Sequence, residues 1–94
     1  MKYYCIADYK SAAAFRLLNI PTYEANIASQ ALKIFDNVVK QDDAGIILIT
    51  DSVADMIRQE LVKFTAKNTM PIILEIPSYD STLSGIRKEN ESKT

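Results

Sequence analysis

Two aspartates, Asp8 and Asp51, occupy positions from which side chains could take part in chemistry. Asp8 follows a short aromatic and aliphatic run at residues 3–7, and Asp51 follows a second apolar run at residues 46–49. If both runs are neighbouring parallel strands, their carboxyl ends meet at one edge of the sheet, where α/β proteins place their functional loops. The pair could then serve as a phosphoryl acceptor. The alternative is that each aspartate caps a helix or closes a turn, as aspartate commonly does.

The neighbours of the two aspartates weigh against phosphoryl transfer. A signalling receiver domain needs an acidic pair after its first strand and a lysine after its last. Here Tyr9 follows Asp8, and the last apolar run ends Ile76-Pro77-Ser78. We therefore expect a structural role for the aspartates and no catalytic residue in the chain.

Other kinds of site are excluded by residue counts. The chain has no histidine and one cysteine, Cys5, so a Cys/His zinc site and a Ser-His-Asp triad cannot be assembled. Its two glycines, Gly45 and Gly85, cannot form a G-x-G-x-x-G motif or a phosphate-binding loop. We therefore predict no cofactor and no metal.

Length, charge and hydropathy favour one small globular domain. The chain has 94 residues, 48% of them hydrophobic, and a net charge of −1, which gives no reason to expect a nucleic acid or an anionic membrane as partner. No stretch approaches the roughly 20 apolar residues of a membrane helix, so we expect no membrane insertion. A single buried thiol and no signal-peptide pattern favour a soluble, cytoplasmic location. We expect a domain at residues 1–86 and a charged, frayed tail at residues 87–94.

The segment around which the chain is organised is residues 44–52, where four consecutive aliphatic residues predict a strand buried on both faces, followed directly by a helix. Its neighbours alternate between strand and helix patterns, which indicates βαβ units. We therefore predict an α/β fold, a small three-layer Rossmann-like or flavodoxin-like domain with a four-stranded, mostly parallel sheet. The other predicted strands are residues 3–7, 22–24 and 70–76, the second of them at an edge; the helices are residues 9–19, 26–41 and 53–68.

Several polar residues predict where these elements begin and end. Asn26 is a favourable N-cap for the second helix, and Asn19 is suited to the left-handed conformation that terminates the first. Ser52 and Asp55 form a weak variant of the capping box. Glu75 interrupts the last aliphatic run, so it either points outward from an edge strand or has a partner inside.

Three stretches, in this order and spacing, resemble the F subunit of the archaeal and bacterial A/V-type rotary ATPases. Residues 7–8 with 15–20, reading Ala-Asp and Phe-Arg-Leu-Leu-Asn-Ile, are similar to the family's Gly-Asp strand end and its Phe-Arg-Leu-Ala-Gly-Ile helix end. Residues 45–50, Gly-Ile-Ile-Leu-Ile-Thr, match the family's central strand, and residues 71–77, Pro-Ile-Ile-Leu-Glu-Ile-Pro, are similar to its Pro-Val-Ile-Val-Glu-Ile-Pro. The resemblance covers residues 3–87.

The resemblance implies a non-catalytic component of the central stalk. The F subunit of this family binds the long helical D subunit, and the pair forms the rotor inside the catalytic A/B ring, where ATP is hydrolysed or made. The soluble sector lies in the cytoplasm, peripheral to the membrane. The charged stretch at residues 87–94 departs from the apolar-patterned helix usual in the family, which leaves a divergent α/β regulatory or binding module as the alternative.

Three groups of residues are candidates for a partner-binding surface. The first combines apolar side chains with an arginine at the end of the first helix, and the others lie in loops after strands, where α/β sheets place functional contacts. For each of them a packing or capping role is the competing interpretation, in particular core packing for Phe15 and Leu18. The candidates are Phe15, Arg16 and Leu18; Thr50, Asp51, Ser52 and Val53; and Ser78, Leu83 and Ile86.

Overall fold

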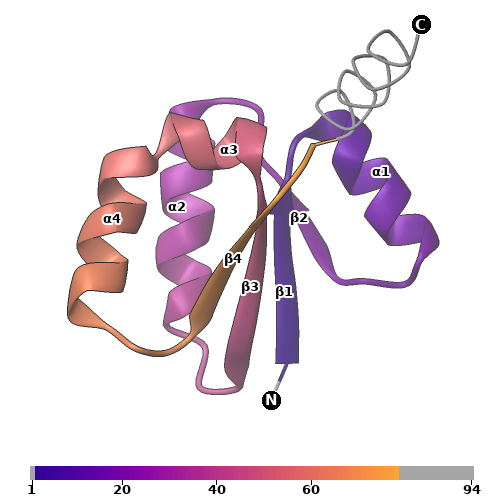
Figure 1. The fold of residues 1–94 in the computed structure, drawn as a ribbon. Coiled ribbons are helices and arrows are strands. Elements are labelled where there is room, and N and C mark those ends of the chain that lie inside the picture. Colours follow the sequence, from indigo (N-terminus) through magenta and orange to yellow (C-terminus); the bar gives the residue numbers. More distant parts are fainter. Residues whose placement is uncertain (1, 79–94) are drawn as a thin grey trace, which may run out of the picture.

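The structure is a computed structural model, and it describes residues 2–78. Strands and helices alternate along the chain, as the hydrophobic pattern predicts, with one additional helix (Figure 1). In chain order the elements are β1 (Lys2–Ala7), α1 (Tyr9–Leu17), β2 (Thr22–Glu24), α2 (Ala28–Val39), β3 (Ala44–Thr50), α3 (Asp51–Met56), α4 (Arg58–Lys67) and β4 (Ile72–Ile76).

All four strands are parallel and lie in the order β2-β1-β3-β4. Helices α2 and α4 lie on one side of the sheet and α1 on the other, as Figure 1 shows. The predicted α/β class and the four-stranded parallel sheet are therefore confirmed, with β1 and β3 inside and β2 at an edge as expected. Strand β4 forms the other edge.

The larger core fills the space between the sheet and helices α2, α3 and α4. Alternate side chains of β1 and β3, among them Ile6, Ile47 and Ile49, are completely buried there. The rings of Phe35 from α2 and Phe64 from α4 meet edge to face, with centroids 5.4 Å apart. This packing fixes the helices on one side of the sheet, because each contributes an apolar stripe to the same cluster.

A smaller core lies under α1, where Cys5, Ala7 and Ala12 are fully buried and Phe15 packs against them. Small side chains at the contact allow the helix to approach the sheet closely. On this side α1 contacts β1 and β2, and the prediction that residues 46–49 are buried on both faces is wrong for Ile46 and Leu48, which are only half-buried.

The predicted single helix at residues 53–68 is also wrong. The structure has two helices, α3 and α4, separated at Ile57, whose backbone is non-helical with φ −126° and ψ 30°. Ile57 is buried in the main core. The hydrophobic periodicity continues from α3 into α4 because both helices pack on the same core. The sequence pattern alone therefore does not reveal where one helix ends and the next begins.

The ends of α1 and α2 give one confirmation and one correction. Asn19 has a positive φ of 60°, as predicted for the residue that terminates the first helix. Asn26, however, does not cap α2. The N-cap is Ile27, which has no side-chain cap, while the Asn26 amide group accepts a hydrogen bond from the Tyr9 backbone and donates one to Glu24. Asn26 thus links the start of α1 to the end of β2.

Candidate interaction surface

Asp8 joins the ends of two strands at the carboxyl edge of the sheet. It is the N-cap of α1, where its carboxylate accepts hydrogen bonds from the Ser11 backbone at 3.3 Å and from the Ser11 hydroxyl at 2.8 Å. The Ser52 hydroxyl, at the start of α3, donates to the same carboxylate at 2.9 Å. The prediction that the residues after the first and third strands share one edge is confirmed, and so is the capping role of Asp8.

The acidity of Asp8 follows from these contacts. Partial burial acts to raise the pKa of the carboxyl, but the hydrogen bonds from Ser11 and Ser52 outweigh it and hold the pKa below its ordinary value. The carboxylate is therefore ionised at neutral pH, with Oδ1 accepting from both hydroxyls. An acceptor of phosphate would have to give up these contacts, so the arrangement favours a structural role.

The Ser52–Asp55 capping box predicted for the third helix is absent from the structure. Ser52 bonds to Asp8, and Asp55 forms an ion pair with Arg58. The N-cap of α3 is Thr50, without a side-chain cap. For Ser52 a distant partner outcompetes the local motif, whereas Asp55 pairs with a residue three positions further along the chain.

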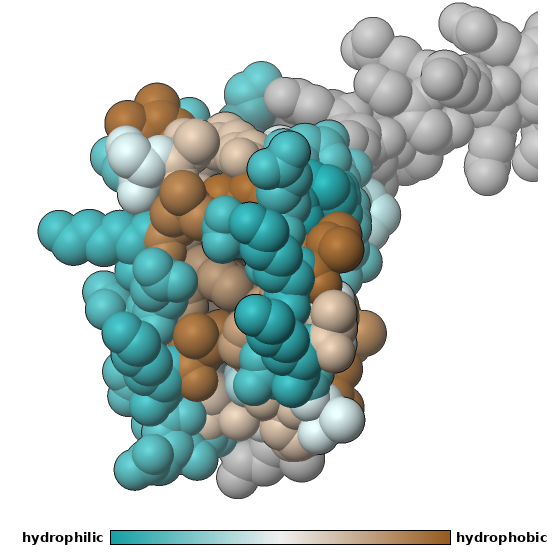
Figure 2. Space-filling model, turned by 90° about the vertical axis from the view of Figure 1, so that its left-hand side faces the viewer, coloured by the Kyte–Doolittle hydropathy of each residue, from teal (hydrophilic) through white to brown (hydrophobic). Residues whose placement is uncertain are grey.

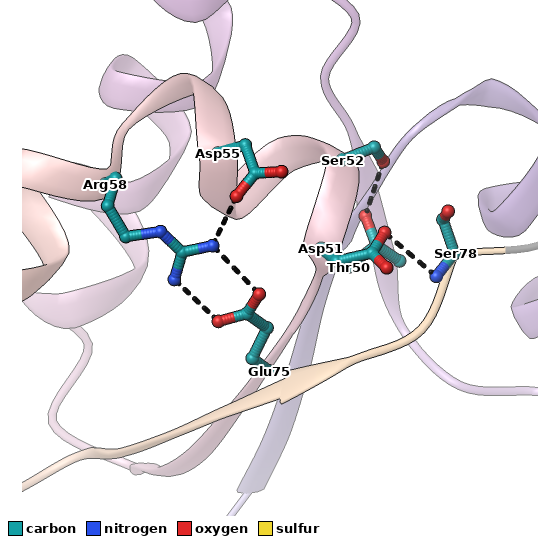
Figure 3. Close-up of polar contacts among 7 residues, drawn as sticks. All are labelled: Thr50, Asp51, Ser52, Asp55, Arg58, Glu75 and Ser78. Carbon is teal, nitrogen blue, oxygen red and sulfur yellow. Dashed lines mark hydrogen bonds and ion pairs between the residues drawn. The ribbon is translucent and has the colours of Figure 1, made fainter. Parts of the chain in front are cut away.

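Asp51 holds the chain where it leaves β4. Its Oδ1 accepts a hydrogen bond from the backbone N–H of Ser78 at 3.2 Å (Figure 3). Ser78 is buried, as are Thr50 and Val53, whose side chains face the interior rather than a free surface. Of this candidate group, Asp51 and Ser52 remain half-exposed at the carboxyl edge.

Arg58 connects α4 to the edge strand β4 through Glu75, and it also contacts Asp55 (Figure 3). Hydrogen bonding to Glu75 and Asp55 raises the pKa of the guanidinium, and the Arg58 contact lowers the pKa of the Glu75 carboxyl. Glu75 thus lies on an edge strand, on the sheet face that α4 covers, partly exposed and with a cationic partner.

Among the candidate groups, as far as the structure describes them, the end of α1 carries the most exposed apolar side chains. Leu18 is 69% exposed, and Leu17, which is not among the residues expected from the sequence, is 85% exposed. Arg16 is also exposed and lies 3.6 Å from Glu24 of β2 in an ion pair, whereas Phe15 packs against the smaller core. We call Arg16, Leu17 and Leu18 the α1 tip. Leu17 could have been found from helical periodicity, since it lies on the opposite side of the helix from Phe15.

The opposite side of the molecule, formed by α2 and α4, is more polar. Figure 2 shows hydrophilic side chains over most of this face, interrupted by smaller hydrophobic areas. The structure also has a shallow depression of mixed polar and apolar lining, formed by Leu32 and by residues 55–60 around the α3–α4 junction.

The described part of the chain shows neither a metal-binding cluster nor a membrane-spanning helix. Within residues 2–78, no three His, Cys, Asp or Glu side chains gather into a group that could hold a metal ion. None of the helices in this range has the length and apolar character required to cross a membrane. The last two candidates for partner binding, Leu83 and Ile86, lie outside the described residues.

Comparison with known proteins identifies relatives along almost the whole chain. Residues 4–93 match the family described as ATP synthase (F/14-kDa) subunit. The F subunit of the A-type ATP synthase of Methanocaldococcus jannaschii is 29% identical over 87 residues, which cover 92% of this chain and 84% of that protein. The F subunits of the V-type ATP synthases of Clostridium botulinum and Fusobacterium nucleatum are 29% and 28% identical over 79 residues, covering 84% of this chain and 75% and 73% of those proteins. The chain therefore belongs to the family of the ATP synthase (F/14-kDa) subunit.

Proposed function

We propose that this chain is a non-catalytic central-stalk subunit of a V-type rotary ATPase. In this role it binds the helical D subunit, contacts the catalytic A/B ring and helps to couple ATP hydrolysis or synthesis to ion transport. It lies in the cytoplasm as part of the soluble sector. The observation that carries the proposal is the family match over residues 4–93, supported by relatives named as the F subunits of A-type and V-type ATP synthases.

The geometry of the carboxyl edge supports a role without catalysis. The Asp8 carboxylate is occupied by Ser11 and Ser52, and Asp51 is bonded to the backbone of Ser78. These contacts join the ends of β1, β3 and β4 to one another, so the edge is stiffened rather than left open for a substrate. A protein that transmits torque benefits from such rigidity.

The α1 tip supports the choice of a protein partner. Two adjacent leucines exposed beside an arginine form a small apolar and cationic surface, and arginine is enriched among the residues that dominate binding energy. Apolar contact with a helical partner would bury both leucines. We propose the α1 tip as part of the contact with the D subunit.

The test is complex formation with the D-subunit homologue of the same organism, followed by gel filtration. We expect a stable one-to-one complex. We expect the double variant Leu17→Asp/Leu18→Asp to weaken it at least about tenfold, because it places two charges in an apolar contact and a loss of about 1.4 kcal/mol is already tenfold. The matched control is Val62→Asp, which places the same charge on an exposed site of α4. ATPase assays of the A/B ring with the D subunit, with and without this chain, then measure coupling.

Two outcomes would contradict the proposal in different ways. If the folded chain forms no complex with the D subunit, the stalk assignment fails and a divergent α/β binding module becomes the better interpretation. If the complex forms but the double variant and the control behave alike, the assignment stands and the α1 tip is not the contact.

A further inference from the structure

The outer side of helix α1 is largely apolar, although this helix lies at the surface. Its inner side packs on the smaller core, with Ser11 and Ala12 buried and Phe15 half-buried. The outer side has four exposed residues at the spacing i, i+3, i+4 and i+7, which places them on one face of the helix. These residues, which we call the outer α1 face, are Lys10, Ala13, Ala14 and Leu17.

Large apolar side chains lie at both ends of the outer α1 face. Tyr9, the first residue of α1, is 67% exposed, and Leu17, the last, is 85% exposed. The middle of the face consists of Ala13 and Ala14, whose short side chains leave the helix backbone close to the surface. Among the described elements α1 is the one helix on its side of the sheet (Figure 1). A helix that is apolar on both sides is normally buried on both sides, so this composition is typical of a covered helix.

The profile of the outer α1 face fits a second α-helix as its cover. Where small residues lie at the contact, two helix axes can approach to about 8 Å, the lower end of the usual range. A helix that crosses α1 over Ala13 would lie between Tyr9 and Leu17 and contact both. An extended strand is a poorer fit, because its backbone N–H and C=O groups need partners and the backbone of α1 is already hydrogen-bonded within the helix.

The charges of α1 indicate the chemistry of the covering helix. Within Tyr9–Leu17 the charged residues are Lys10 and Arg16, and both are cationic. Arg16 pairs with Glu24 of β2 at 3.6 Å, whereas Lys10 belongs to the outer α1 face itself. A helix with carboxylates beside its apolar stripe would therefore be attracted to α1, and a helix with lysine or arginine there would be repelled.

The same charges argue against a second copy of this chain as the cover. In an antiparallel pair of α1 helices with a two-fold axis at Ala13, Lys10 of each copy would lie opposite Arg16 of the other copy. In a parallel pair, Lys10 would lie opposite Lys10. Both arrangements bring like charges together, which disfavours self-association.

We propose that the outer α1 face is the docking site of a partner α-helix that has an apolar stripe bordered by carboxylates. The partner helix crosses α1 closely over Ala13, and Tyr9 and Leu17 pack against its two sides. This inference rests on the proposed function, in which the D subunit supplies the helix. It extends the contact from the α1 tip to the start of α1, and it specifies the closeness and the charge of the contact.

The size of the side chain at position 13 tests the closeness of the contact. The measurement is the affinity of the full chain for the D-subunit homologue, by isothermal titration calorimetry. Ala13→Leu adds apolar surface at an exposed helical position, where leucine is a strong helix former, so the variant should fold. It should nevertheless weaken the complex at least about tenfold, because the larger side chain overpacks a close crossing. Ala13→Ser should retain most of the affinity, and the matched control is Ala66→Leu, at an exposed position of α4.

Reversal of the charge at position 10 tests the electrostatic part. Glutamate is favourable in the first turn of a helix, so Lys10→Glu should fold. It should weaken the complex severalfold at low salt, and the loss should shrink at high salt because screening removes the attraction in the native complex as well. The matched control is Lys63→Glu, an exposed charge reversal on α4 that should leave the affinity unchanged.

The possible outcomes separate this inference from the stalk assignment. If the native chain forms no complex with the D subunit, both fail. If the complex forms but Ala13→Leu binds as tightly as the native chain, or Lys10→Glu does, the assignment stands and this inference is overturned. A dimer of the native chain in gel filtration with light scattering, dissociated by Ala13→Leu, would show that a second copy covers α1, which also overturns the inference.

Discussion

The Arg58 guanidinium binds both carboxylate oxygens of Glu75, with N–O distances of 2.6 and 2.9 Å. Arg58 begins α4, and Glu75 lies in the edge strand β4, so the pair joins a helix directly to the strand that follows it in the sequence. This contact explains how an otherwise aliphatic strand accommodates a carboxylate. At an edge, on the side of α4, the charge has both a partner and access to water.

A double-mutant cycle should show a real but small contribution from this pair. Because both side chains are more than two-fifths exposed, we expect the coupling between Arg58→Gln and Glu75→Gln to be measurable but weak, even with bidentate geometry. The measurement is urea unfolding of the two single variants and the double variant. Coupling should decrease in high salt. Lys63→Gln, an exposed substitution on the same helix, is the control, and a coupling energy unaffected by salt would contradict the assignment.

Loss of the Asp8 side chain should destabilise the domain through the start of α1. Asp8→Ala removes the N-cap of α1, which accepts from the Ser11 backbone, and it also removes the carboxylate to which the Ser52 hydroxyl donates. We therefore expect a loss of about 0.5–2 kcal/mol in the free energy of unfolding. Asp8→Asn retains a capping oxygen and should lose less. Denaturant unfolding of both variants checks this, and equal losses would show that charge rather than capping dominates.

The lowered pKa of Asp8 predicts acid sensitivity. The carboxylate is stabilised in the folded state, so its contribution is fully present above its ordinary pKa of 3.8 and is lost as the pH falls through the lower folded value. The stability advantage of the native chain over Asp8→Asn should therefore shrink below about pH 4. Glu75 and Asp43 titrate in the same direction in both proteins, so the difference between the two curves isolates Asp8. Parallel curves down to acid pH would contradict this.

Hydrophobic periodicity and turn chemistry were sufficient to predict the architecture. Strands β1, β3 and β4 each have a concentrated apolar run, and the helices have apolar residues at helical spacing. Asn19 and Asp8 are residue types with strong local preferences. The consequences of long-range partners were not predictable in the same way. Local caps were expected for Ser52 and Asn26, but Ser52 bonds to Asp8 and Asn26 to the Tyr9 backbone, both distant in the sequence.

The surface was predicted less well than the fold, for a physical reason. An aliphatic run has the same composition whether helices cover one face of the strand or both. The sequence of residues 46–49 therefore does not indicate that Ile46 and Leu48 lie on a partly uncovered face. Likewise a loop surface was expected at residues 50–53, but β3 extends to Thr50 and α3 begins at the next residue, so that Val53 is buried in the core. Exposure depends on which helix lies over each strand, and no local pattern contains that information.

Cys5 should be unreactive in the folded protein. It is completely buried under α1, and burial raises the pKa of its thiol to about 11, so almost no thiolate is present at mildly alkaline pH. We expect modification by a thiol reagent to be slow in the native chain and fast in denaturant. The positive control is Cys5→Ala/Leu18→Cys, whose thiol on the α1 tip should react at once. Rapid native labelling of Cys5 would show that α1 separates from the sheet under native conditions.

Substitutions of Asn19 should differ strongly in their effect on stability, because this residue has a left-handed backbone. With φ at 60°, this residue turns the chain from the end of α1 into the segment leading to β2, and its backbone N–H donates to the Arg16 carbonyl at 3.1 Å. Side chains with a Cβ disfavour this conformation, while asparagine tolerates it and glycine is free to adopt it. We expect Asn19→Gly to be nearly neutral and Asn19→Ala to cost about 1 kcal/mol in the free energy of unfolding, as measured by denaturant titration.

A matched substitution inside a helix separates the cost of the left-handed backbone at Asn19 from the loss of an asparagine side chain. Asn37→Ala, at an exposed position inside α2, should be neutral or slightly stabilising because alanine is the better helix former. Equal effects of alanine at positions 19 and 37 would mean that the left-handed turn is not required. The α1 tip would then be positioned by its own contacts, chiefly the Arg16–Glu24 ion pair and the packing of Phe15, rather than by the turn that follows it.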